Sequence, residues 1–546
     1  ERLEKYSSRQ VIRPVPGDSY TRDVSSALRM AVDSALGRID DRLRGVARLQ
    51  VGALAVLAES GVPTRWIDPL ADEERAGEDT GAGAAGEDAD AGDAAAENAH
   101  LALTALTKAS VVQQSADGGV TMLHRLQGQV LRENWIPKKC PEAFDMAADL
   151  LDRADIDSLP RKDTARRRRE AHDLIEQLRA IAAQGYSRPL FERERVVADL
   201  PHVLFHARDL GLPNEALTLR GAVGVVEGVL GAEHPDSLAS RNSLAAAYQA
   251  AGRLGEAIAL YEGVLADSVR VLGEDHPSTL ASRNNLAYAY QAAGRLGEAI
   301  ALYEGVLADS VRVLGPDHPH TLTSRGNLAA AYESAGRLGE AIPLFEGVLA
   351  DSVRVLGPDH PDTLTSRGNL AAAYESAGRL GEAIPLYEQV LADSARVLGA
   401  DHPDTLTSRG SLAGAYQAAG RLGEAIPLYE EVLADRVRVL GADHPHTLAS
   451  RNNLAYAYES AGRLGEAIPL LEEVVADRVR VLGDDHPDTL TSRGSLAAAY
   501  ESAGRLGEAI PLYEEVLADY VRVLGADHPH TLTSRNNLAY AYQAAG

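Results

Sequence analysis

The residues whose type and spacing suggest chemistry are eight histidines that recur at one constant spacing, each followed by proline. Imidazole nitrogens bind metals and move protons. However, a metal bond reaches only about 2 Å, whereas copies in successive structural units lie a full layer apart. Each histidine also stands just before a predicted helix start, so we interpret the row as a structural turn. The eight are His234, His276, His318, His360, His402, His444, His486 and His528.

Other groupings that would indicate catalysis or a cofactor are weak. Cys140 is the single cysteine, which excludes an internal disulfide and a cysteine-based zinc site, and we interpret it as a small core residue in a reducing cytoplasm. No nucleophile, base and orienting group are grouped in the sequence, so we expect no catalytic residue, no metal site and no enzyme activity. The G-x-x-x-x-G-K-[S/T] loop that cradles a triphosphate does not occur, so we expect no cofactor in this chain.

Charge and composition narrow the class of partner. The net charge of -25 over 546 residues makes nucleic acid an unexpected partner, because binding to phosphates needs a basic surface. One strong basic cluster, RKDTARRRRE at 161–170, is more typical of a solvated helix face or a surface that pairs with acids. The longest apolar run, 51–57, is far shorter than the roughly 18 residues of a transmembrane helix, so we expect no membrane association and a cytoplasmic protein.

The 42-residue period of the histidines predicts an array of repeated units over 235–546. In the unit 275–316, Pro277 fits the first turn of a helix and Gly294 suits the end of one, and a second helix is predicted over about 296–314. We call these two segments helix A and helix B. Each has one apolar face that a single unit cannot bury, so neighbouring units must stack. The pattern therefore predicts an all-α solenoid of seven full units and a final helix A.

The units also carry a resemblance to a known family. The pattern L-A-x-x-Y, then G, then E-A-x-x-x-Y resembles tetratricopeptide repeats, and the 42-residue form ending R-V-L-G-x-D-H-P is similar to the repeats of kinesin light chains and their bacterial relatives. A looser unit at 196–234 is expected to cap the array. In that family the units form a superhelix whose concave groove suits proteins and peptides, so the resemblance implies a protein or peptide partner.

Differences between the near-identical units concentrate on one face of helix A. The varying positions fall at offsets of 0, 3, 7 and 10 along the helix, which places them on a single helical face. In the family that the array resembles, this face lines the groove. Kinesin light chains are similar in carrying paired asparagines there, a pair that the middle units break to Gly-Asn or Gly-Ser. The predicted partner-binding residues are Asn242, Asn284, Tyr288, Gln291, Glu333, Glu375, Gln417, Asn452, Tyr456, Glu459, Glu501, Asn536 and Tyr540.

The middle units place glycine inside helix A, at Gly326, Gly368, Gly410 and Gly494. A glycine in a helix interior costs about 1 kcal/mol relative to alanine. Two explanations stay open. Duplication copied a tolerated defect, or the backbone of a partner approaches closely at these positions.

The first two hundred residues have a different composition. Helices are predicted over 25–36 and 51–58, and 71–98 is predicted to be an acidic low-complexity loop. A β-hairpin is predicted over 110–123, turned at Asp117-Gly118-Gly119, with a helix on either side. This order of helix, hairpin and helix is that of a winged helix.

Residues 20–134 resemble the end of a STAND-class (NB-ARC-like) nucleotide switch, above all in LAVLAESGVPTRWIDPL and LTALTKASVVQQSADGGVTMLHRLQGQVLREN. In that family a winged helix follows an ATPase core and precedes a repeat sensor. The Met-His-Asp motif of the family falls on Leu123-His124-Arg125, where only His124 matches. The resemblance implies that His124 senses a nucleotide, with core packing as the alternative, and that ATP or ADP binds to a domain upstream of Glu1.

These expectations combine into one organisation. Because the chain lacks a first methionine and stops within a unit, we expect a fragment of a longer protein. The resemblance implies that this chain is the autoinhibitory sensor half of a bacterial signalling switch. It also implies that the switch forms homo-oligomers on activation and that it suits a role in defence. A winged-helix DNA-binding transcription regulator and a plain interaction scaffold are the alternatives. The predicted parts are 1–70, the end of a nucleotide-switch region; 71–98, an acidic loop; 99–135, the winged-helix remainder; 136–195, a helical linker; 196–234, a capping repeat; and 235–546, the repeats.

Overall fold

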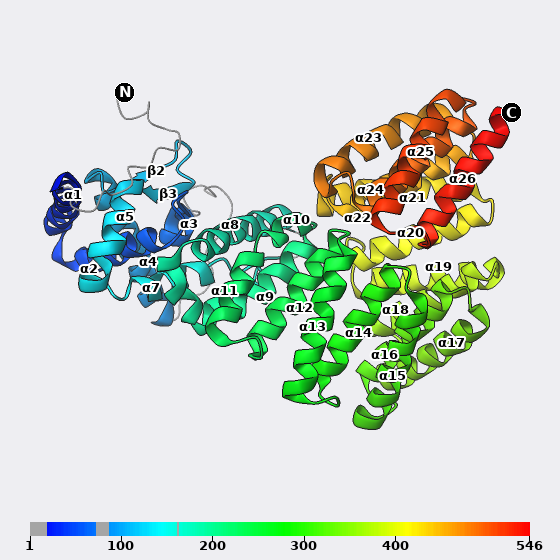
Figure 1. Cartoon of the computed structure of the whole chain (residues 1–546), viewed down its shortest axis with the longest axis horizontal. Helices are drawn as coiled ribbons and strands as arrows, with labels where there is room; N and C mark the ends of the chain where they lie inside the picture. The colour runs from blue at the N-terminus through cyan, green and yellow to red at the C-terminus, as the bar shows by residue number, and fades with distance from the viewer. Residues whose placement is uncertain (1–18, 72–86, 161–162) are drawn as a thin grey trace. The chain divides into compact units, whose positions relative to one another are not determined.

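The repeating pattern of the sequence is a series of helix pairs in the computed structural model, which describes residues 19–71, 87–160 and 163–546 (Figure 1). Two compact units can be distinguished. The first holds the residues up to 155 together with 172–199, and the second holds 156–171 together with 200–546. Helix α8 (Thr164–Ala182) contributes residues to both units. Among the described residues, no helix is long and apolar enough to cross a membrane.

The first unit is helical with a small sheet. Its three short antiparallel strands lie in the order β1-β3-β2, with Val62 opposite Thr121 and Val112 opposite Leu123. The hairpin of β2 and β3 confirms the predicted turn, where the Asp117 side chain accepts a hydrogen bond from the backbone N–H of Gly119 at 3.0 Å. The elements are α1 (Ser19–Arg38), α2 (Asp41–Val56), β1 (Val62–Pro63), α3 (Thr64–Ile67), η2 (Pro69–Ala71), α4 (Glu87–Lys108), β2 (Val112–Gln114), β3 (Val120–Leu123), α5 (Arg125–Asn134), α6 (Ile136–Lys139), α7 (Ala143–Asp152) and η3 (Gly185–Glu192).

The core of this unit forms around the second half of α2. Gly52 lies so close to α7 that a Cβ there would stand 2.7 Å from the Cβ of Ala143 and 3.0 Å from the Sγ of Cys140. Cys140 is fully buried, and burial raises the pKa of its thiol to about 11, which confirms the core interpretation.

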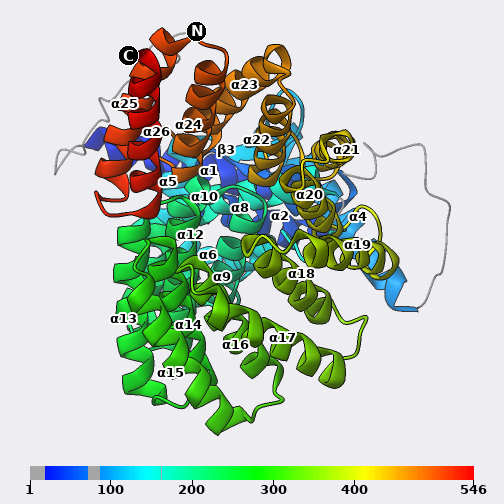
Figure 2. The same cartoon turned by 90° about the vertical axis from the view of Figure 1, so that its right-hand side faces the viewer.

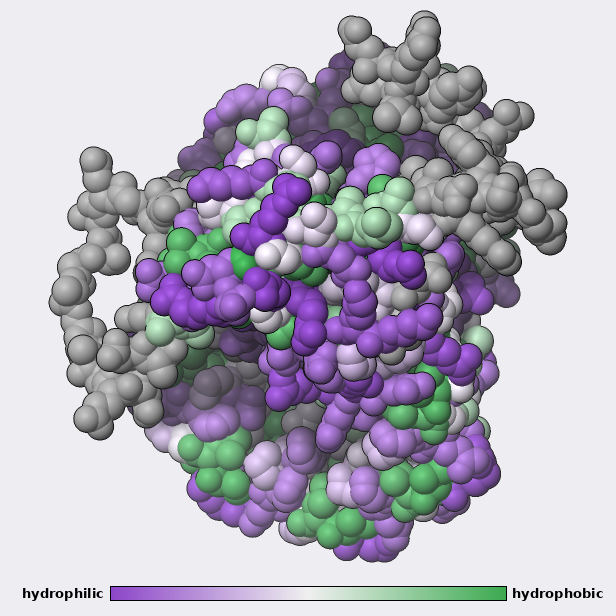
Figure 3. Space-filling model, turned by 90° about the vertical axis from the view of Figure 1, so that its left-hand side faces the viewer, coloured by the Kyte–Doolittle hydropathy of each residue, from purple (hydrophilic) through white to green (hydrophobic). Residues whose placement is uncertain are grey.

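Seen from the left-hand side of Figure 1, the molecule's surface is mainly hydrophilic, with apolar residues in small separate patches (Figure 3).

Two boundaries differ from the sequence-based expectation. Helix α4 begins at Glu87, so residues 87–98 are helical and not part of a loop, while 72–86 lie outside the described residues. The alanines of this stretch favour a helix. The stretch 136–195 is not a separate linker either, because most of it belongs to the first unit and 156–171 belongs to the second.

The second unit is the predicted all-α solenoid. Ahead of the repeats lie α9 (Glu194–Asp209), of which residues from 200 on belong to this unit, α10 (Pro213–Leu217) and α11 (Arg220–Leu230). The helices A are α12 (Pro235–Ala250), α14 (Pro277–Ala292), α16 (Pro319–Ser334), α18 (Pro361–Ser376), α20 (Pro403–Ala418), α22 (Pro445–Ser460), α24 (Pro487–Ser502) and α26 (Pro529–Ala545). The helices B are α13 (Leu254–Leu272), α15 (Leu296–Leu314), α17 (Leu338–Val355), α19 (Leu380–Val397), α21 (Leu422–Leu440), α23 (Leu464–Leu482) and α25 (Leu506–Val523).

Small and aromatic residues hold neighbouring helices together. Ala287 on helix A and Ala299 on helix B are fully buried, so the two backbones approach closely, and Tyr303 fills the adjoining space. The hydroxyl of Tyr290 donates a hydrogen bond to Glu262 of the preceding helix B at 2.6 Å. The guanidinium of Arg295 lies 4.0 Å from the centroid of the Tyr290 ring. Every unit is therefore tied to the one before it.

The periodic histidines are the N-caps of the helices A, which confirms the structural-turn interpretation. In each, the ring Nδ1 accepts a hydrogen bond from the backbone N–H two residues later, at 3.1 to 3.3 Å. Because Nδ1 is the acceptor, the proton of the neutral ring resides on Nε2. No group of three or more metal-ligating side chains is found within the described part of the chain.

Three of these histidines make a second contact, which joins one turn of the superhelix to the turn before it. The Nε2 atoms of His444, His486 and His528 lie 3.1, 3.0 and 3.3 Å from the carbonyl oxygens of Asp209, Ala250 and Ala292, which are 235 or 236 residues earlier. These three rings are buried, whereas the rings of the five earlier histidines are exposed or half-buried. Successive turns of the solenoid are thus in contact where α12 approaches α24 (Figure 2).

Glycine substitutions test this contact between turns. Gly252 and Gly378 both end a helix A with φ +72, but a Cβ at Gly252 would lie 2.3 Å from Pro487, whereas one at Gly378 meets nothing within 4 Å. Both alanine variants carry the left-handed backbone penalty of about 1 to 2 kcal/mol. We expect Gly252→Ala to lose at least about 1 kcal/mol more in urea unfolding, because Pro487 must move. Equal losses for the two variants would contradict the contact.

The same contact predicts sensitivity to acid. Burial lowers the pKa of His444 to about 4, and lowers the pKa of His486 and His528 as well. The unfolded chain therefore binds more protons than the folded one below about pH 6.5, and the free energy of unfolding falls as pH drops from 6.5 towards 4. His444→Asn keeps an N-cap residue but removes the titrating ring. Urea unfolding across this range should show a shallower pH dependence for that variant, and an unchanged dependence would contradict the assignment.

Candidate functional site

The helices A, which carry the varying positions, run on the inner side of the curve: α14, α16 and α18 lie inside α15 and α17 (Figure 2). Three predicted residues on the varying face are unusually open to solvent. Tyr288 is 58% exposed, Tyr456 57% and Tyr540 67%. A tyrosine gains stability by burying its ring, so three that stand exposed at the same repeat position offer a contact surface.

The predicted asparagines bridge neighbouring helices A. The side-chain amide of Asn285 donates to Asn242 at 3.1 Å, and that of Asn327 donates to Asn284 at 3.0 Å. Asn452 accepts a hydrogen bond from Ser492 at 2.9 Å. Asn536 is exposed on α26. The asparagines therefore help to set the spacing of the helices and keep further donor and acceptor capacity towards the groove.

The predicted glutamines and glutamates form a second line of contacts along the groove. Gln291 and Gln417 donate to Ser334 and Ser460 at 2.9 and 3.0 Å. In two of the units with glutamate the pairing reverses, because a serine donates to a carboxylate: Ser376 to Glu333 at 2.7 Å and Ser502 to Glu459 at 2.8 Å. Each pair joins one helix A to the next.

Two of the groove carboxylates are additionally held by helix B. The hydroxyl of Tyr387 donates to Glu375 at 3.0 Å, and that of Tyr513 donates to Glu501 at 3.1 Å. Burial, together with the charge of Glu333, raises the pKa of Glu375. Burial and the neighbouring Glu501 raise the pKa of Glu459 in the same way. The middle of the groove is therefore acidic and partly desolvated.

The largest of the cavities that we describe, about 740 Å³, lies where the two turns of the solenoid meet. It brings the predicted Asn242 and Tyr288 together with Phe205 and Arg208 of α9, which were not predicted. Phe205 is half exposed, and the guanidinium of Arg208 lies 5.0 Å from the centroid of its ring. Residues of the second turn, among them Asp488, complete the wall. Because the segments that form this wall lie far apart in the sequence, no local sequence signal could predict the cavity.

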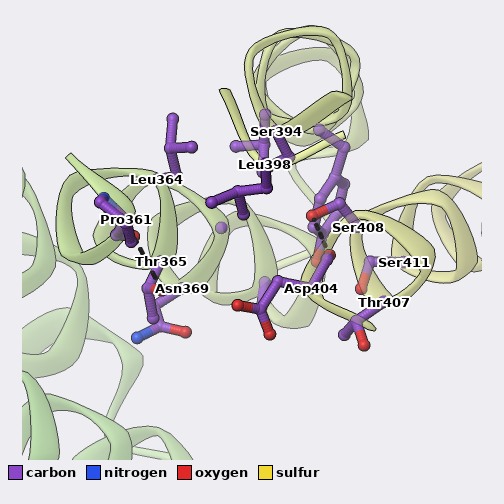
Figure 4. Close-up of a pocket in the computed structure, with 14 residues that line it drawn as sticks. Pro361, Leu364, Thr365, Asn369, Ser394, Leu398, Asp404, Thr407, Ser408 and Ser411 are labelled. Atoms are coloured by element: carbon purple, nitrogen blue, oxygen red, sulfur yellow. Dashed lines mark hydrogen bonds between the residues drawn. The ribbon is translucent and has the colours of Figure 1, made fainter. Parts of the chain in front are cut away.

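Two smaller cavities of about 250 and 160 Å³ lie between successive helices A in the middle units. Gly368 lines the first (Figure 4) and Gly326 lines the second. A Cβ at either glycine would meet nothing within 4 Å. Packing within the chain therefore does not require these glycines, and their effect is to widen the groove.

The other predicted features have distinct surroundings. His124 is exposed at the start of α5, so its alternative as a core residue is wrong, and the nucleotide-sensing role stays a prediction. The basic cluster is not wholly a solvated face, because Arg167 is buried. Beside it, the hydroxyl of Thr164 donates to the carbonyl of Val439 at 2.6 Å. Residues 161–162 of the cluster lie outside the described residues.

Comparisons with known proteins found similar solved structures and one matching family. Among curated proteins, none matches this chain. Of the solved structures, a kinesin light chain with nearly identical TPR-like repeats from Podosopora anserina is 41% identical, over 38% of this chain and 97% of that one, with a TM-score of 0.33. A Rap protein in complex with competence and sporulation factor is 12% identical, over 67% of this chain and 99% of that one, with a TM-score of 0.45.

A third similar structure is a Signal Transduction ATPase with Numerous Domains (STAND) protein with a tetratricopeptide repeat sensor, from Pyrococcus horikoshii. It is 14% identical, over 94% of this chain and 68% of that one, with a TM-score of 0.47. The tetratricopeptide repeat family profile matches at residues 236–310, 284–352, 327–394, 378–436, 411–478, 462–520 and 503–546. These matches together span more than half of the sequence, and the chain belongs to the tetratricopeptide repeat family.

Proposed function

We propose that the inner face of the solenoid binds an extended segment of a protein partner. The observation that carries the proposal is the set of three exposed tyrosines, each with an asparagine four residues earlier on the same helix. Residues four apart lie on one face of a helix, so each pair presents a ring and an amide side by side. The pairs are Asn284 with Tyr288, Asn452 with Tyr456, and Asn536 with Tyr540.

This chemistry suits a peptide backbone. An amide side chain offers both a donor and an acceptor, which an extended backbone can use, while the tyrosine ring covers the side chains beside it. The half-buried carboxylates Glu333, Glu375, Glu459 and Glu501 give the groove an acidic character, which favours a segment with basic residues. The function is therefore that of a protein-binding sensor.

We further propose that this sensor is the regulatory half of a STAND-type switch, in which partner binding shifts the winged helix and releases an upstream nucleotide domain for homo-oligomerisation. The support is the resemblance of residues 20–134 to the end of such switches, together with the hairpin of β2 and β3 in the expected place. In this proposal His124, exposed after β3, faces the nucleotide of the upstream domain. A DNA-binding regulator is less favoured, because Arg167 of the basic cluster is buried.

The groove proposal predicts a position-specific loss of affinity. Peptides selected from a displayed random library against the whole chain provide the probe, with binding measured by calorimetry. Tyr288→Ser and Tyr456→Ser together should weaken binding about tenfold or more, because exposed aromatic rings at interfaces contribute most of the affinity. Val311→Ser, at an exposed position of helix B, is the control and should leave the affinity unchanged. A larger loss from Val311→Ser than from the tyrosine variants would contradict the proposal.

The switch proposal predicts a response outside the repeats. Hydrogen exchange of residues 20–135 is compared with and without the selected peptide at saturation. A sensor coupled to the winged-helix region should change exchange near β3 and His124, because binding then biases the conformation of that region. A plain scaffold would bind the same peptide and leave exchange there unaltered, which would overturn the switch role while leaving the groove proposal intact.

A further inference from the structure

One position on helix B divides the repeats into two kinds. It faces the space between successive helices A, and it changes from a small to a large side chain along the array. Serine occupies the early units and arginine or tyrosine the late ones. The series, with one residue from each successive unit, is Ser268, Ser310, Ser352, Ser394, Arg436, Arg478 and Tyr520.

In the late units the large side chain fills the space between the helices A. The Nη1 of Arg436 donates to the carbonyl of His446 at 3.0 Å and to the hydroxyl of Ser450 at 2.7 Å, and its Nη2 donates to Thr407 at 3.1 Å. Arg436 is buried in this position. The chain itself thus shows a guanidinium bound between two helices A.

The next unit repeats the arrangement. The Nη1 of Arg478 donates to the carbonyl of Asp488 at 2.5 Å and to the hydroxyl of Ser492 at 2.7 Å, and this side chain is also buried. The negative charge of Asp488 partly offsets the desolvation that lowers the pKa of Arg478. A backbone carbonyl and a serine hydroxyl at corresponding positions therefore accept an arginine twice, and the second time without the threonine, which is Ala449 in this unit.

In the unit with Ser394 these receptor groups surround a cavity of about 250 Å³ (Figure 4). Thr365, Asp404 and Ser408 line it, and they stand exactly one unit before Thr407, His446 and Ser450, the three partners of Arg436. Figure 4 shows Thr365 of α18 on one side and Asp404 and Ser408 of α20 on the other, with Ser394 of α19 above them. The site that Arg436 fills is thus present here without a large side chain to fill it.

The remaining walls suit the stem of an arginine. Leu364, Tyr387, Val390 and Leu398 provide an apolar lining, and Gly368 leaves space on the groove side. The carboxylate of Asp404, where the next unit has His446, adds a negative charge at the rim and is largely exposed. A cationic head with a hydrocarbon stem matches this combination.

We infer that the pocket of Thr365, Ser394, Asp404 and Ser408 binds an arginine side chain of the partner. The inference rests on the proposed groove function and names the residue that the groove recognises. A guanidinium is preferred over an ammonium, because the receptor groups lie in the fork arrangement that Arg436 uses in the next unit. A smaller cavity of about 160 Å³ with the corresponding residues Thr323, Ser352, Asp362 and Ser366 lies one unit earlier. Two arginines of one segment would therefore find adjacent pockets.

Nα-acetyl-arginine methylamide is the direct probe, titrated against the whole chain by saturation-transfer NMR and equilibrium dialysis. A single side chain should bind with a Kd of roughly 1 mM, and the lysine, citrulline and tyrosine analogues at least about tenfold more weakly.

The double variant Ser352→Arg/Ser394→Arg places the chain's own guanidinium in both pockets, as Arg436 does, and should abolish binding. Arg436→Ser opens a further pocket and should raise the number of bound arginines by one.

Thermal unfolding of each variant verifies that the solenoid is intact, and Val311→Arg is the matched control. Val311 is 40% exposed on helix B, so this variant adds a guanidinium outside the pockets and should retain arginine binding. Unchanged binding in the double variant, or a preference for the tyrosine analogue, would overturn the inference. If library peptides still bind and depend on Tyr288, only the arginine pocket fails; if arginine binds but no peptide does, the groove function fails.

Discussion

The stacking of each helix pair on its neighbours is the interaction on which the rest of the structure depends. Ala287, Ala299 and Tyr303, and their counterparts in most units, are buried where helices of the same unit and of the next unit pack together. A single unit would leave these surfaces in water, so stability is shared along the array. Much of the variation lies on one face of helix A and at one place on helix B, whereas the stacking position of Tyr303 changes only to other large apolar side chains, Phe345 and Leu471.

A second constraint acts across the superhelix. Three identical His-Pro turns are buried against backbone carbonyls of the preceding turn, in an arrangement that requires the neutral ring with its proton on Nε2. The glycines opposite them leave no space for a side chain at Gly211 and Gly252. The same motif is thus a simple N-cap in the first five units and a contact between turns in the last three, beside the cavity that Phe205 and Arg208 line.

Much of this fold could be predicted from local sequence signals. Proline marks the first turn of every helix A, glycine follows the end of helices A and B, and Asp117-Gly118-Gly119 marks the hairpin. The contacts between turns could not be predicted, because His360 and His486 have nearly the same sequence around them and differ only in what lies above them in space. The pockets at Ser352 and Ser394 were missed for a related reason. The change from serine to arginine and tyrosine at one helix B position gives no local signal of a pocket, because the receptor groups Thr365 and Ser408 converge on it only in the folded array.

The array therefore combines a constant frame with a variable inner surface, and its central claim is that this surface holds an extended partner segment. Hydrogen exchange of residues 200–546, with and without a selected peptide, tests the claim most directly. We predict slower exchange in the helices A of the units that the peptide contacts, around Tyr288 and Tyr456, with smaller changes in the helices B. Protection confined to the outer helices B, with the helices A unaltered, would contradict the account.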